Sequence, residues 1–96
     1  MTIEKLINNF LSNLSNVSRY SEHTLKAYTN DLYEFKKYCL SKDRSEISLI
    51  NERFVKSYLI FLNEKELDKK TISRKLAAVR SLFKYAFQND IIEENP

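Results

Sequence analysis

The sequence predicts an all-α domain, a four-helix bundle, and three observations carry that prediction. Apolar residues recur at the three- and four-residue spacing of an amphipathic helix along most of the chain. Glycine is absent and the one proline is the last residue, which disfavours the tight hairpin turns of an all-β fold. A chain of 96 residues fits one domain, so we expect a single domain over residues 1–96.

The first two helices are predicted from their caps and apolar faces. Thr2 is the expected N-cap of the first helix, whose inner face is Ile3, Leu6, Ile7, Phe10, Leu11 and Leu14. The segment VSRYS, residues 17–21, interrupts the pattern. Ser21 is then the expected N-cap of a helix over residues 22–41, whose inner face is Leu25, Tyr28, Leu32, Phe35 and Cys39.

A polar connector, SKDRSEISLIN, separates the second helix from the third, and we expect a short turn in it to dock Ile47 and Ile50. Asn51 is the expected N-cap of a helix over residues 52–65, whose inner face is Phe54, Val55, Tyr58, Leu59 and Leu62. The fourth helix is expected to start at Lys70 or Thr71 and to end near Gln88. Its inner face is Ile72, Leu76, Val79, Phe83 and Ala86.

Charge is distributed unevenly along the chain. Residues 69–89 contain no acidic residue and six basic ones, whereas the other 75 residues hold 10 basic and 13 acidic side chains. The fourth helix therefore carries a formal charge of +6 on a body of −3, although the net charge of the chain is only +3. Such an asymmetry is typical of a protein that binds a polyanion.

Small side chains and cations alternate on the face of the fourth helix opposite its apolar residues. At 100° per residue this face holds Lys70, Ser73, Arg74, Ala77, Ala78, Ser81 and Lys84. Small residues let a helix enter the major groove of double-stranded DNA, and cations hold it there. We expect Arg74 to contact a base edge. We expect phosphate contacts from Lys70, Lys75, Arg80 and Lys84.

The outer face of the second helix is expected to take part as well. It holds His23, Lys26, Ala27, Asn30 and Lys37, with Ser21 and Thr24 in the first turn, where free N–H groups and the helix dipole favour a phosphate. Capping alone also explains Ser21 and Thr24. A solvated surface equally explains a basic face, and a protein-interaction module that docks an acidic partner is a second hypothesis.

Several other functions are disfavoured. No His, Cys or carboxylate cluster has a spacing that indicates an active site or metal site, so we expect no catalytic residue, metal, cofactor or small-molecule substrate. Without glycine there is no phosphate-binding loop of the P-loop or Rossmann kind. No apolar run is long enough to span a membrane, and the N-terminus does not resemble a signal peptide. The single Cys39 fits a reducing, cytoplasmic setting.

Two segments resemble the N-terminal core-binding domain of tyrosine site-specific recombinases of the phage integrase and Xer type. YSEHTLKAYTNDLYEFKKYC resembles the family's S-x-x-T-x-x-x-Y-x-x-x-L-x-x-F, through Ser21, Thr24, Tyr28, Leu32 and Phe35. KKTISRKLAAVRSLFKYAFQNDIIEENP is similar to its T-x-x-R-x-L-S-A-[LV]-R-x-F-[FY]-x-[FY] helix and I-x-x-N-P exit. The matching residues are Thr71, Arg74, Leu76, Ala78, Val79, Arg80, Phe83, Tyr85, Ile92, Asn95 and Pro96.

The resemblance covers essentially the whole chain and implies a SAM-like helical fold that clamps DNA at a core recombination site. It implies DNA contacts at Ser21, His23, Thr24, Lys26 and Ala27, and at Lys70, Thr71, Ser73 and Arg74. It also implies other recombinase protomers as partners in a synaptic tetramer. The family's catalytic Arg, Lys, His and Tyr motifs are not found, so we expect this chain to bind DNA without cutting it, and a catalytic domain to follow Pro96.

Overall fold

The computed structural model describes residues 1–16 and 20–95. Within them it contains α1 (Ile3–Ser15), α2 (Glu22–Ser41), the short 3-10 helix η1 (Ile47–Leu49), α3 (Glu52–Glu64) and α4 (Lys69–Gln88). The predicted all-α class and helix positions are confirmed, and α4 begins at Lys69 rather than at Lys70 or Thr71. The predicted break at VSRYS falls mainly on residues 17–19, and the exit proline is residue 96. Those residues lie outside the described part of the chain.

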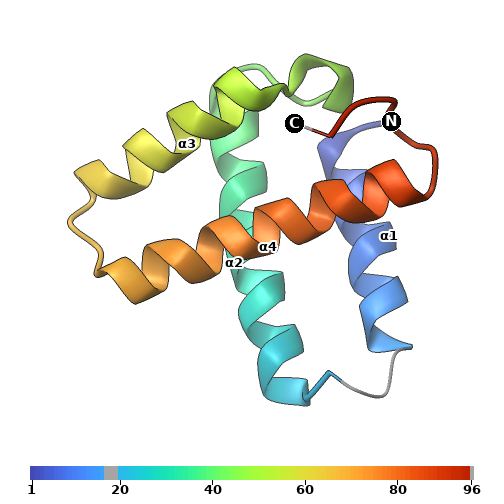
Figure 1. Ribbon diagram of the computed structural model, residues 1–96, viewed down its shortest axis with the longest axis horizontal. Helices are drawn as coiled ribbons and strands as arrows, with labels where there is room; N and C mark the ends of the chain where they lie inside the picture. The colour runs from blue at the N-terminus through green and yellow to red at the C-terminus, as the bar shows by residue number, and fades with distance from the viewer. Residues whose placement is uncertain (17–19, 96) are drawn as a thin grey trace.

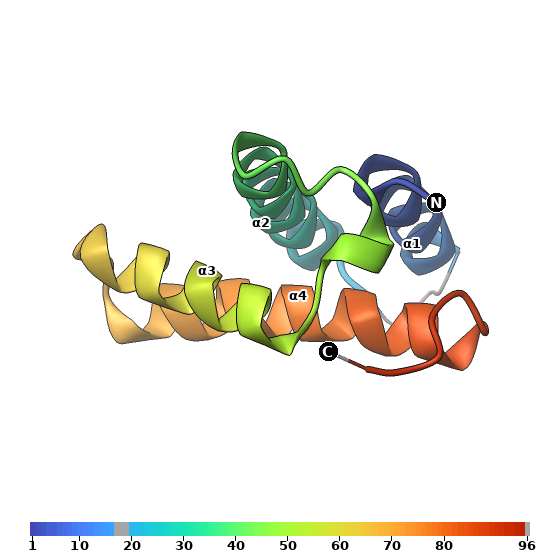
Figure 2. The same ribbon diagram turned by 90° about the horizontal axis from the view of Figure 1, so that it is seen from above.

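The helices are arranged in two layers (Figures 1 and 2). α1 and α2 lie side by side and antiparallel in one layer, and α3 and α4 form the other. α4 runs across both helices of the first layer and contacts α1, α2 and α3. As a result the N-terminal half of α4 lies against the middle of α2, which brings two distant parts of the sequence together.

An aromatic cluster joins three of the helices in the core. The ring of Phe35 on α2 packs against Tyr58 on α3 with centroids 5.0 Å apart, and against Phe83 on α4 at 6.2 Å. All three side chains are buried, as are Ile47 and Ile50 of the connector, which confirms the predicted docking turn. Cys39 is also fully buried, and burial raises the pKa of its thiol to about 12, so it stays protonated.

Side-chain caps define where each helix begins. Thr2, Ser21 and Asn51 accept hydrogen bonds from backbone N–H groups of the first turn, which confirms the three predicted N-caps. The fourth N-cap is Asp68, whose carboxylate accepts a hydrogen bond from the Thr71 N–H at 2.8 Å. This hydrogen bond lowers the pKa of Asp68 below its ordinary value.

Three helices end at left-handed residues, although the chain has no glycine to occupy such positions. Asp43, Glu66 and Asp90 have φ values of 57°, 57° and 56°, each one residue beyond a C-cap. At the end of α4, the N–H of Ile91 bonds the Ala86 carbonyl and the N–H of Asp90 bonds the Phe87 carbonyl, as in a Schellman motif. Aspartate thus takes the turn position that glycine usually fills.

Candidate nucleic-acid interface

A buried ion cluster lies where α4 crosses α2. Asp31 on α2 is 0% exposed, and its carboxylate accepts hydrogen bonds from Arg74 Nε at 2.9 Å and Arg74 Nη2 at 3.0 Å. Lys75 Nζ donates to the same carboxylate at 3.0 Å and also to Glu34. α2 therefore supplies acids to a helix that has none of its own.

The cluster is electrically balanced, because two carboxylates face two cations. Burial alone would lower the pKa of Lys75, but its hydrogen bonds to Glu34 and Asp31 outweigh that effect and raise it. The hydrogen bond to Asp31 likewise raises the pKa of Arg74. Both cations thus stay charged at neutral pH. A buried carboxylate would be costly without such partners.

The prediction that Lys75 and Ala78 belong to the DNA-facing surface is wrong. The Lys75 residue is only 5% exposed and its ammonium group is held by Asp31 and Glu34, so it does not present a charge to phosphates. Ala78 is 0% exposed. The reason is common to both: α4 is covered by α2 and α1 on one side and by α3 on another, so its buried arc is wider than its apolar residues indicate.

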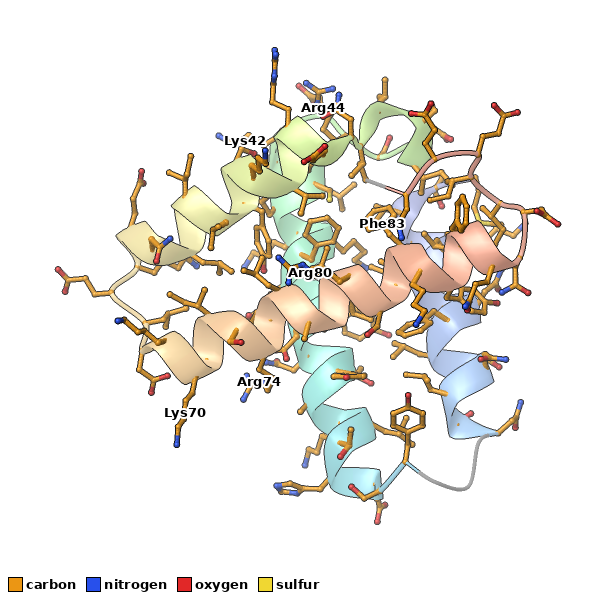
Figure 3. The ribbon with its side chains drawn as sticks, in the orientation of Figure 1. Lys42, Arg44, Lys70, Arg74, Arg80 and Phe83 are labelled. Carbon is orange, nitrogen blue, oxygen red and sulfur yellow. The ribbon has the colours of Figure 1, made fainter. Side chains whose placement is uncertain are left out.

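All the remaining predicted residues of α4 except Thr71 lie on its outer face or at its edge. Lys70, Ser73, Ala77 and Lys84 are exposed and Ser81 is half-buried. Figure 3 shows the Lys70 and Arg74 side chains leaving α4 on the side away from α3, whereas Arg80 lies nearer to α3. Thr71 is half-buried and faces the other way, where it lines a cavity of about 610 Å³ with residues such as Lys65 and Leu67.

The ion cluster reduces the number of cations that α4 can offer to a ligand. Of its six basic side chains, two are paired with Asp31 and Glu34, which leaves four. Those four are exposed and make no ion pair within the described residues. They are Lys69, Lys70, Arg80 and Lys84. The outer face of α4 is therefore positive, with small side chains between the cations.

The first three turns of α2 continue this surface beyond the crossing. His23, Lys26 and Asn30 are exposed, and Ala27 is half-buried one turn before Asp31. Ser21 accepts a hydrogen bond from the Thr24 N–H at 3.1 Å, and the two hydroxyl groups are 2.9 Å apart and hydrogen-bonded. We name the outer-surface set the α2/α4 face. It consists of Ser21, His23, Thr24, Lys26, Ala27, Asn30, Lys70, Ser73, Arg74, Ala77, Arg80, Ser81 and Lys84.

Arg74 occupies the border between the two helices, and its side chain is 47% exposed. The prediction of a base-edge contact took the guanidinium to be free. One edge of it is in fact bound to Asp31, so only the remaining edge can meet a ligand. The sequence analysis assigned no role to Asp31 or Glu34, so it did not predict this cluster.

The fold and a family match define the class of protein. The chain belongs to the family of phage integrase N-terminal SAM-like domains, whose match covers residues 7–90. This confirms the resemblance drawn from the two motifs. No helix in the described ranges combines the length and apolar character needed to cross a membrane.

Among curated proteins the chain is similar to tyrosine recombinases XerC. The relative from Pediococcus pentosaceus is 32% identical over 93 residues, which cover 96% of this chain and 31% of that protein. The relative from Listeria innocua is 33% identical over 87 residues, which cover 91% and 29%. This chain thus spans less than a third of the length of the relatives it matches. No solved structure matches it significantly.

Proposed function

We propose that this chain binds double-stranded DNA through the α2/α4 face, as the part of a tyrosine recombinase that holds the core recombination site. The observation that carries the proposal is the outer face of α4, where exposed cations without ion pairs within the described chain alternate with Ser73, Ala77 and Ser81. A helix with small residues between cations can approach the floor of a major groove while its cations meet phosphates. Membership of the integrase family supports the same function.

The geometry fits a duplex. A helix of 20 residues is about 30 Å long, comparable to one turn of DNA. The N-terminal half of α4 crosses the middle of α2, so the outer faces of the two helices can follow one groove and the adjacent backbone. The cluster at the crossing keeps the two helices in register, because it joins Asp31 to Arg74 and Lys75.

The chemistry of strand exchange is proposed to belong to sequence outside this chain. The relatives are named tyrosine recombinases and are more than three times longer than the part that this chain matches. We infer that this domain clamps core-site DNA while the rest of such a protein performs transesterification, and that other protomers join it in a synaptic assembly. On its own the chain is expected to bind DNA without cleaving it.

The test is a DNA-binding measurement with a charge-matched control. Fluorescence anisotropy with a short labelled duplex of random sequence should show binding by the wild-type chain at low salt. The double substitution Lys70→Gln and Lys84→Gln should weaken that binding roughly tenfold, because it removes two phosphate contacts. The control is the double substitution Lys36→Gln and Lys56→Gln, which also removes two charges, from cations outside the α2/α4 face that are already paired with Glu4 and Glu52. That double substitution should leave the affinity nearly unchanged.

Two results would count against the proposal. If the wild-type chain binds no duplex at low salt, the α2/α4 face does not bind DNA. If the double substitution of Lys36 and Lys56 weakens binding as much as that of Lys70 and Lys84, the attraction comes from net charge alone and not from this face. If the chain does not bind DNA and binds an acidic protein tightly, the interaction-module hypothesis is favoured.

A further inference from the structure

Asp31 holds Arg74 in one fixed orientation. The carboxylate oxygen Oδ2 accepts from Arg74 Nε at 2.9 Å and Oδ1 accepts from Nη2 at 3.0 Å, which is a two-point, side-on pairing. Asp31 is itself immobilised, because it is 0% exposed and also bonded to Lys75. An exposed Arg normally samples many rotamers, but two parallel hydrogen bonds to a buried partner define both the position and the plane of this guanidinium.

The pairing leaves a defined set of donors for a ligand. A guanidinium has five N–H groups, and Asp31 takes one from Nε and one from Nη2. The two N–H groups of Nη1 and the second of Nη2 remain, so the end of the fork presents one donor from each terminal nitrogen. Two donors side by side match the O6 and N7 acceptors of guanine in the major groove.

We propose that Asp31 is a positioning residue that makes Arg74 a reader of guanine rather than a phosphate contact. This inference rests on the proposed DNA binding and adds the specificity determinant to it. The cations with no such restraint, Lys70 and Lys84, supply affinity that is independent of sequence. Arg74 supplies preference for a DNA sequence, because a guanidinium in a fixed plane can satisfy a guanine edge and cannot adapt to every base pair.

The direction in which one substitution changes the affinity for DNA separates positioning from simple electrostatics. Asp31→Asn removes a negative charge beside the DNA-binding surface, so electrostatics alone predicts equal or tighter binding to every duplex. Loss of positioning predicts weaker binding to the preferred duplex only. The matched control is Glu34→Gln, which removes the same charge one turn further along α2. The Glu34 side chain pairs with Lys75 and not with Arg74.

The experiment uses the duplex that the wild-type chain selects from a randomised library and a scrambled duplex of the same composition. The readout is the ratio of the two affinities. Asp31→Asn should lower this ratio about 10- to 100-fold, the range for one bidentate base contact, while binding to the scrambled duplex stays equal or becomes tighter. Glu34→Gln should keep the wild-type ratio. Circular dichroism verifies that each variant is folded.

Arg74→Lys provides a second measurement should Asp31→Asn fail to fold. Lysine keeps the charge and lacks the planar fork, so the ratio should fall while the salt dependence on the scrambled duplex remains that of wild type. A wild-type ratio in either Asp31→Asn or Arg74→Lys would overturn this inference and leave the proposed DNA binding standing. A wild-type chain that binds duplexes without any preference would overturn it too. A wild-type chain that binds no duplex would instead refute the proposed function.

Discussion

Tyr58 carries a polar group that the fold leaves without a hydrogen-bond partner. Its hydroxyl is the one buried side-chain polar atom among the described residues that makes no hydrogen bond, and the residue is only 1% exposed. Burial, followed by the nearby charge of Glu34, raises the pKa of the Tyr58 phenol, so the group stays neutral. The ring is needed for packing against Phe35, whereas the oxygen contributes no bond to the fold.

We therefore expect Tyr58→Phe to raise the free energy of unfolding by about 1 kcal/mol, because it removes a buried and unsatisfied hydroxyl while keeping the ring. Tyr38→Phe is the matched control. The Tyr38 hydroxyl is hydrogen-bonded to Ser57 Oγ at 2.8 Å, so its loss should lower the free energy of unfolding by about 1 kcal/mol. Urea denaturation measures both values. A clear loss of stability in Tyr58→Phe would show that the hydroxyl has a stabilising role.

The charged residues show where prediction from this sequence stops. The 100° projection identified the centre of the buried face of α4, but it gives no measure of how far a crossing helix widens that face. A signal for the ion cluster was nevertheless present. Asp31 lies three residues after Tyr28 and four before Phe35, and Lys75 has the same register between Ile72 and Val79. Opposite charges at inward positions of two helices indicate that the helices meet there.

The helices themselves were easier to predict than their contacts. N-caps follow from local chemistry, so Thr2, Ser21 and Asn51 could be identified from the sequence alone. The C-terminal ends of α2, α3 and α4 were predicted to within one residue. What the sequence did not indicate is that left-handed Asp and Glu residues stand where glycine usually follows a helix. Of these, Glu66 is the least suited, since Asp and Asn are the residues besides glycine that tolerate this region best.

Glu66→Gly should accordingly raise the free energy of unfolding by about 0.5–1 kcal/mol. Relief of the left-handed strain, about 1–2 kcal/mol, outweighs the extra freedom that glycine gives to the unfolded chain. Asp90→Gly, at the same conformation but from a better-tolerated residue, should give a smaller gain. Thermal unfolding compares the two variants with wild type. A larger gain from Asp90→Gly than from Glu66→Gly would contradict this account of the helix ends.

Across the domain, the structure separates charge that is available to a ligand from charge that is used internally. The sequence places six cations and no acid in residues 69–89, yet the two layers pack so that acids of α2 neutralise two of those cations. The tertiary fold, and not the local sequence, therefore decides which lysines can meet a phosphate. Lys70 and Lys75 illustrate the difference, because they lie on the same helix five residues apart and only Lys70 is exposed.

This difference can be measured as the salt dependence of binding to a random-sequence duplex. Each phosphate contact contributes about −0.9 to the slope of log affinity against log salt. Lys70→Met should therefore make the slope less negative by about 1, because it removes a contact. Lys75→Met removes the same charge from the sequence but no contact from the surface, so its slope should equal that of wild type, once circular dichroism has shown that it is folded. If Lys75→Met changed the slope as much as Lys70→Met, Lys75 would have to leave Asp31 and Glu34 when DNA binds. The ion cluster would then not keep α2 and α4 in register on DNA.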